Sequence, residues 1–189
     1  MKKILVVLLL ALTSFAYGQR FTGGVFAGLN VSQIHGDTQG GYHKAGPAGG
    51  AFVQTDFREN WGGMLELRYN EKGSGLLMDD GNLIIRLQYI EIPVLVTYNF
   101  FEKVQPQAGV AFGYLFRQTQ KEGGIVDPID DYYNFEVSAC LGVAYSLSDL
   151  LKVNVRYAIS MIPIWQAYPG AMAARSLEAA YNDVITFSL

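Results

Sequence analysis

The sequence is poor in cysteine and in charge. Cys140 is the only cysteine among the 189 residues, which excludes an intramolecular disulfide framework, a CxxC redox pair and a multi-cysteine zinc site. Charged residues make up 16% of the chain, against the ~25% of typical soluble domains. The net charge of −3 also argues against a nucleic-acid partner. Stability must therefore come from backbone pairing and burial.

Apolar and aromatic residues and glycine are abundant instead. Half of the residues are apolar, and the chain contains 21 Gly, 12 Tyr and 11 Phe. This composition excludes a disordered chain and favours strands over a helical bundle.

The first 18 residues have the layout of a secretory signal peptide. A basic Lys2-Lys3 pair precedes the apolar run Ile4 to Leu12, and Ala16-Tyr17-Gly18 forms a cleavage signal before Gln19. The apolar run is shorter than the about 18 residues of a transmembrane helix. We therefore expect export, cleavage near Gly18-Gln19, and one domain over residues 19–189.

Long stretches of the mature chain alternate with a period of two. From residue 133 to 147 the odd positions are mostly large and apolar, whereas the even positions are small or polar. Residues 151–162 repeat the pattern after a Ser148-Asp149 turn. Such alternation predicts strands much longer than the about 5–6 residues usual in soluble proteins.

The same pattern predicts eight strands, at 23–34, 46–57, 61–73, 83–99, 104–118, 132–147, 151–162 and 176–189. The connections are short at 58–60, 100–103 and 148–150, and long at 35–45, 74–82, 119–131 and 163–175. All long loops then lie at one end of an up-and-down meander. This asymmetry predicts an all-β, eight-stranded antiparallel transmembrane β-barrel in contact with outer-membrane lipid, closed so that no sheet edge meets hydrocarbon.

Side chains of both charge signs fall on the inward phase of these strands. An eight-stranded barrel is filled by side chains, so we expect a polar network that plugs the lumen and has a structural role; a proton or ion path is the alternative. The expected members are Glu66, Arg68, Glu91, Lys152, Arg156 and Glu178. Aromatic girdles are expected on the outward phase, from Trp61, Tyr69, Tyr98, Tyr114, Tyr133, Tyr145 and Tyr157.

Two features leave alternatives open. A soluble secreted ligand-binding barrel also alternates, with its apolar face inside; the polar face disfavours it, because glycines such as Gly109 and Gly142 share that face and small residues suit the crowded side. Strict alternation also places Asp183 on the lipid face, where an acid is unfavourable. Either a bulge near Asn182 or a position near the rim would relieve this.

Short motifs are spread along nearly the whole mature chain. They are, in order, Ala27-Gly28-Leu29-Asn30-Val31-Ser32 with Gly36-Asp37, Leu65-Glu66-Leu67-Arg68-Tyr69 with Lys72-Gly73, Tyr89-Ile90-Glu91-Ile92-Pro93-Val94-Leu95, Pro106 through Ala108-Gly109 to Gly113-Tyr114-Leu115, and Arg156-Tyr157. Their order and spacing resemble the PorT-like outer-membrane β-barrel family of Bacteroidota. The resemblance implies a small integral barrel, and some relatives belong to a secretion and gliding apparatus. The chain departs from the pattern at Leu189, where barrels usually end in an aromatic residue.

Catalytic signatures such as GxSxG, the P-loop and HExxH are absent from the sequence. Ser32, His35, Asp37 and His43 are of the types needed for acyl transfer or metal binding. Ser32, His35 and Asp37 are only a few residues apart, whereas catalytic groups normally come from distant segments. The metal ligands would be His35, Asp37 and His43, and two histidines and one acid in a flexible loop rarely preorganise a site. We therefore expect solvated loop residues, with no catalytic site, metal or cofactor; an outer-membrane lipid acyltransferase or hydrolase is the alternative.

Function is expected at the long-loop end. A structural or interaction barrel and an accessory of a secretion machine both fit the sequence, and we expect a monomer with a protein partner at the external loops. Loop 119–131 is acidic, whereas loop 163–175 offers an apolar contact patch of Ile164, Trp165, Tyr168 and Met172. The alternative for loop 163–175 is a lid over the barrel mouth.

Overall fold

The computed structural model describes residues 21–35, 41–76, 83–101, 103–122, 125–129, 132–166 and 179–189. The predicted signal peptide lies outside these residues and stays a prediction. Within the described part, no helix is long and apolar enough to cross a membrane.

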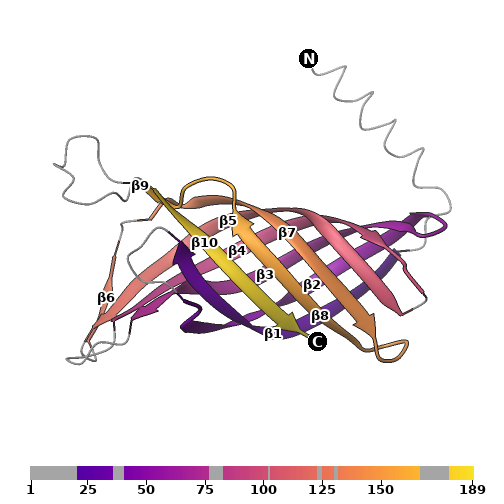
Figure 1. Cartoon of the computed structure of the whole chain (residues 1–189), viewed down its shortest axis with the longest axis horizontal. Helices are drawn as coiled ribbons and strands as arrows, with labels where there is room; N and C mark the ends of the chain where they lie inside the picture. Colours follow the sequence, from indigo (N-terminus) through magenta and orange to yellow (C-terminus); the bar gives the residue numbers. More distant parts are fainter. Residues whose placement is uncertain are drawn as a thin grey trace, which may run out of the picture.

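The described chain is all-β (Figure 1). Its strands are β1 (Phe21–His35), β2 (Lys44–Arg58), β3 (Trp61–Leu76), β4 (Leu83–Tyr98), β5 (Val104–Glu122), β6 (Ile125–Pro128), β7 (Phe135–Ser146), β8 (Lys152–Ser160), β9 (Trp165–Gln166) and β10 (Ala179–Ser188). The two short strands β6 and β9 lie at the same end of the molecule (Figure 1), where β6 pairs with β5 and β9 pairs with β10.

Eight of the strands form one closed antiparallel barrel. The order is β1-β2-β3-β4-β5-β7-β8-β10, and β10 pairs back with β1. This closing ladder runs from Gly28↔Ser188 to His35↔Tyr181. Closure pairs the backbone groups that an open sheet would leave at its edges. The predicted fold class is therefore confirmed.

The strand bounds differ from the prediction at the long-loop end. β5 continues to Glu122 because β6 folds back and pairs with it, so part of the predicted loop 119–131 is a hairpin. β7 begins at Phe135 and not at residue 132, because the backbone N–H of Tyr133 donates to the carbonyl of Ile164 and not to a neighbouring barrel strand.

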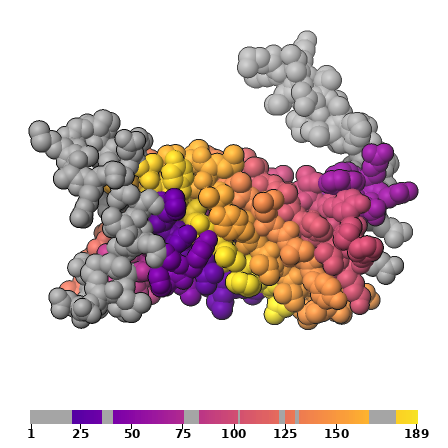
Figure 2. Space-filling view, in the orientation of Figure 1, coloured from indigo at the N-terminus to yellow at the C-terminus, as the bar shows by residue number. Residues whose placement is uncertain are grey.

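The barrel has polar side chains inside and apolar side chains outside. Along β7, Glu136, Ser138 and Cys140 are buried, whereas Leu141 and Val143 on the other face are exposed. On the face shown in Figure 2, β1, β10 and β8 present a continuous outer wall. A soluble ligand-binding barrel would have the reverse arrangement, so that alternative is excluded by the burial pattern.

Aromatic residues gather near both ends of the barrel wall. At the short-turn end, the rings of Trp61 and Tyr98 meet edge to face at 4.9 Å, and Phe100 lies 6.5 Å from Tyr98. At the long-loop end, Tyr69 lies 6.2 Å from Phe116. Two such rows are the girdles that hold a transmembrane barrel at the two membrane interfaces.

Candidate functional site

The upper part of the lumen, toward the long loops, is organised around Lys72 on β3. Its Nζ lies 2.6 Å from Glu91 Oε1 and 2.8 Å from Glu136 Oε1. Glu136 also accepts hydrogen bonds from the side chains of Ser138, Ser160 and Asn182 at 2.6 to 2.8 Å. Such hydrogen bonds offset the cost of removing these charges from water.

A second chain of hydrogen bonds joins the first and last strands of the barrel to this group. Thr186 Oγ1 on β10 donates to Asn30 Oδ1 at 2.7 Å, Asn30 donates to Asn70, and Asn70 Nδ2 donates to Glu91 Oε2 at 2.8 Å. The closing seam between β10 and β1 is therefore tied through its inner face to β3 and β4.

The lower part of the lumen, toward the short turns, is organised around Arg156 on β8. Both terminal nitrogens of Arg156 donate to the Glu66 carboxylate at 2.7 Å, and one also donates to Gln107 at 2.8 Å. Arg68 lies beside this pair with longer separations, 3.7 Å to Glu66 and 3.9 Å to Glu91. A two-pronged arginine–carboxylate contact is among the strongest in proteins.

These six buried ionic groups balance in charge. Three are acidic and three are basic. They are Glu66, Glu91, Glu136, Arg68, Lys72 and Arg156. A balanced set can stay ionised in the lumen, which suits a plug.

Four of the six predicted network residues lie in the lumen, namely Glu66, Arg68, Glu91 and Arg156. Lys152 does not belong to the network: as the first residue of β8 it is exposed at the short-turn mouth, and it makes no ion pair with any residue that the structure describes. Glu178 lies outside the described residues.

Sequence reasoning missed Glu136 as a member of the network. A usable signal was present, because Glu136 shares the inward phase of its strand with Ser138 and Cys140. Its partners Lys72 and Asn182 come from β3 and β10, which are 64 and 46 residues away in the chain. Periodicity gives the face of a strand, but it does not give contacts across the lumen.

The long-loop mouth is closed by apolar side chains. Ile34, Leu87, Tyr89, Leu115, Ile164 and Ala180 form one buried cluster, with Trp165 packed against it. Ile164 is 0% exposed, so its assignment to an external contact patch is wrong: the side chain fills the mouth, as the lid alternative expects. Trp165 is half-buried, and its strand β9 pairs with β10. Tyr168 and Met172 lie outside the described residues.

Asp183 lies near the rim, and its strand carries no bulge. The ladders of β10 with β1 and with β8 run through Asp183 without a register shift. Tyr42 from the first long connection donates its hydroxyl to Asp183 Oδ1 at 2.8 Å, and Gln33 donates to Oδ2 at 3.0 Å. These contacts cover a carboxylate that faces outward. Burial and the Asp183 carboxylate together raise the pKa of Tyr42 to about 12.

The residues weighed for acyl transfer or metal binding are not assembled into a site within the described part of the chain. The hydroxyl of Ser32 is buried and donates to the carbonyls of Gly73 and Lys44 at 3.0 and 3.3 Å. His35 and His43 are exposed, and Asp37 lies outside the described residues. Among the residues described, no three acidic, histidine or cysteine side chains are grouped to hold a metal ion.

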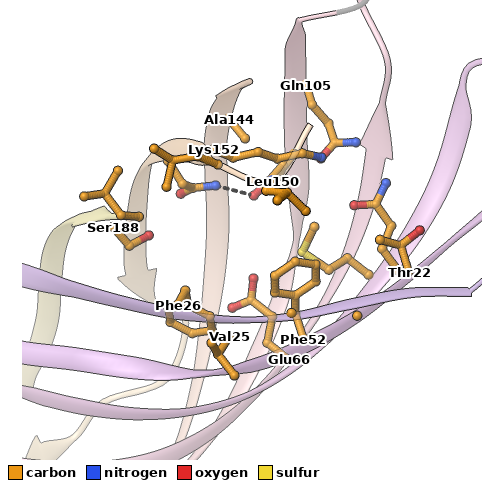
Figure 3. Close-up of a pocket in the computed structure, with 18 of the residues that line it drawn as sticks. Thr22, Val25, Phe26, Phe52, Glu66, Gln105, Ala144, Leu150, Lys152 and Ser188 are labelled. Atoms are coloured by element: carbon orange, nitrogen blue, oxygen red, sulfur yellow. Dashed lines mark hydrogen bonds between the residues drawn. The ribbon is translucent and has the colours of Figure 1, made fainter. Parts of the chain in front are cut away.

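A cavity of about 600 Å³ occupies the short-turn end of the lumen. Figure 3 shows Phe26, Phe52 and Glu66 on one side of it, and Ala144, Lys152 and Gln105 on the other. The cavity ends inside the barrel at the Glu66, Arg68 and Arg156 group. With the apolar cluster and the ionic network above it, the lumen is closed at one end and hollow at the other.

A closed antiparallel barrel with a polar interior, an apolar wall and aromatic girdles is the architecture of an integral outer-membrane protein. The model of the family described as outer membrane protein beta-barrel domain matches residues 14–166. The chain belongs to this family and is a small outer-membrane β-barrel protein. A search of curated protein sequences gives no significant match.

Several solved structures are similar to the chain, including the following two. One is Ail, the attachment invasion locus protein of Yersinia pestis, with 10% identity, a TM-score of 0.52 and coverage of 90% of this chain and 95% of Ail. The other is Neisserial surface protein A, with 10% identity, a TM-score of 0.54 and coverage of 90% and 96%. At this identity the similarity concerns the fold.

Proposed function

We propose that the protein is a surface interaction protein of the outer membrane that acts through its long-loop end. The observation that carries the proposal is the filled lumen. Paired charges occupy the middle of the barrel, and the cluster around Ile164 closes the long-loop mouth. A barrel filled in this way is a poor conduit for ions, so its solvent-facing ends are the parts left for function. Ail, an attachment invasion locus protein, and Neisserial surface protein A share the barrel fold.

The hairpin of β5 and β6 is the best-defined candidate for contact at that end. All four residues of β6 are exposed, including the apolar Ile125 and Val126. Among the described strands, β6 pairs only with β5, which leaves its other edge without a described partner. An exposed strand edge with apolar side chains can bind an extended peptide, which then adds a strand to the sheet.

Site-specific crosslinking in intact cells tests the proposal. A photoreactive amino acid at Ile125 is compared with the same residue at Leu150, which is 99% exposed in a short turn at the opposite end. We expect a discrete adduct from position 125 that disappears when protease is added outside the cells, and no such adduct from position 150. Equal adducts from both positions, or none from 125, would contradict the proposal.

The finer relationship to PorT-like proteins is part of the proposal. The motifs that carry this resemblance contain Glu66, Arg68, Glu91 and Arg156, four of the six ionic groups of the lumen network. These four residues therefore support the proposal that this chain and the PorT-like proteins have a similar lumen network. A secretion component captured in the Ile125 adduct would support the accessory role, and an extracellular ligand would contradict it.

A further inference from the structure

The cavity at the short-turn end has the size and access of a ligand pocket. Its volume of about 600 Å³ lies within the range of about 300–1,000 Å³ typical of small-molecule sites. The lining residues Leu150 and Lys152 are exposed, so the cavity opens to solvent between the short turns. In an outer-membrane barrel, the short turns face the periplasm.

Arg68 is the basic side chain of the cavity floor with the weakest partners. The Glu66 carboxylate is held by both terminal nitrogens of Arg156, and the Glu91 carboxylate is held by Lys72 and Asn70 at 2.6 and 2.8 Å. Arg68 is left with separations of 3.7 and 3.9 Å to these two acids. Both distances exceed the 2.7–3.2 Å of an ordinary N–H···O hydrogen bond.

One nitrogen of Arg68 is also without a hydrogen bond. Arg68 is 4% exposed, and its Nε has no hydrogen-bond partner among the described residues. Buried polar groups are nearly always paired, and an unpaired donor of a charged group is costly. Arg68 lines the cavity, so an oxygen anion that enters from the periplasmic side can supply an acceptor to its guanidinium group.

The residues that line the cavity indicate which chemical groups the anion should have besides its negative charge. Phe26, Phe52 and Met64 line the cavity, and the centre of the Phe26 ring lies 5.3 Å from the Arg68 guanidinium carbon. Apolar walls favour a hydrocarbon tail or ring beside the charge. One poorly paired arginine offers donors for a single carboxylate group, whereas a doubly charged phosphate would place more negative charge beside Glu66.

We infer that this cavity is a periplasm-facing binding site for a small monocarboxylate with a short apolar tail, and that Arg68 binds the carboxylate. The site lies at the opposite end of the barrel from the β5–β6 hairpin, so the inference is independent of the proposed surface interaction. It departs from the sequence-based expectation that function lies only at the long-loop end.

Nuclear magnetic resonance of the full mature chain in lipid nanodiscs tests the inference. The probe is hexanoate, and the uncharged hexanamide is its matched control. Arginine Nε–H signals and methionine methyl signals are recorded during titration. We expect hexanoate to shift Arg68 Nε–H and the Met64 methyl, while Met161, exposed at the long-loop end, stays unchanged. Hexanamide should produce no saturable shift of the Arg68 signal.

Two variants separate binding from folding. Arg68→Gln should weaken hexanoate binding at least tenfold. Ala144→Leu adds bulk to a buried wall position and leaves every ionic group in place, so it should also weaken binding while the Arg68 signal of the free protein persists. Failure of hexanoate to shift Arg68 in the folded wild type, equal shifts with hexanamide, or tighter binding of inorganic phosphate would each overturn the inference.

Discussion

Arg156 on β8 and Glu66 on β3 face each other across the full width of the barrel, joined by two hydrogen bonds of 2.7 Å. Three strands separate β3 from β8 in one direction around the wall, namely β4, β5 and β7, and three in the other, namely β10, β1 and β2. The pair therefore connects opposite walls that have no ladder in common. It braces the lumen in a way that pairing between neighbouring strands does not.

Removing one partner of this pair should destabilise the barrel strongly. Arg156→Met leaves the Glu66 carboxylate buried without its main partner, which should lower the free energy of unfolding by about 3–5 kcal/mol. The double variant Glu66→Leu with Arg156→Met should recover much of this loss, because the Glu66 carboxylate is no longer buried without its main partner. Urea unfolding in lipid vesicles measures both. A single variant within about 0.5 kcal/mol of wild type would show that the pair does not brace the lumen.

Charge on the outer wall should be costly at mid-strand and harmless in a turn. Val143 and Val155 are cross-strand neighbours on β7 and β8 and are exposed on the apolar face. Val143→Arg or Val155→Arg should each cost about 2–4 kcal/mol of folding stability in a bilayer if they lie near its midplane. Leu150→Arg, in a short turn, is the matched control and should stay within about 0.5 kcal/mol. Equal effects at Val143 and Leu150 would contradict lipid contact.

Gly73 should tolerate no side chain. It has a φ of +142°, and a Cβ built there would lie 2.0 Å from the carbonyl oxygen of Ile85 on the neighbouring strand. Gly73→Ala should therefore cost about 1–3 kcal/mol. Gly63 on the same strand is the control, because its Cβ would meet only the Phe57 ring, at 3.6 Å. Comparable unfolding midpoints for Gly73→Ala and Gly63→Ala would contradict the close backbone approach.

Tyr42 should make the rim sensitive to alkaline pH. Because its pKa rises from 10.0 to about 12 on folding, its contribution to stability is complete below pH 10 and is lost as pH rises through 12. A carbon-13 titration of the tyrosine ring should show Tyr42 ionising near pH 12, and Asp183→Asn should move this value back toward 10. Ionisation of Tyr42 near pH 10 in the wild type would mean that the contact with Asp183 does not form.

The sequence was informative about the wall of the barrel and less so about its interior. Period-two alternation identifies the inward phase of Glu66 and the outward phase of Val143, because it follows directly from the pleat of a strand. The cover over Asp183 depends on Tyr42, which is 141 residues away in the chain. The burial of Ile164 depends likewise on packing against Leu87 and Tyr89. Contacts of this kind are set by closure of the barrel, and no local pattern encodes them.

The most direct test is the gel migration of the protein extracted from purified outer membranes with detergent, compared with and without boiling. A closed, hydrogen-bonded barrel resists detergent until it is heated. The protein should therefore be recovered in the outer-membrane fraction and should migrate as a compact form that shifts on boiling. Recovery in the soluble periplasmic fraction, or identical migration before and after boiling, would contradict a closed outer-membrane barrel.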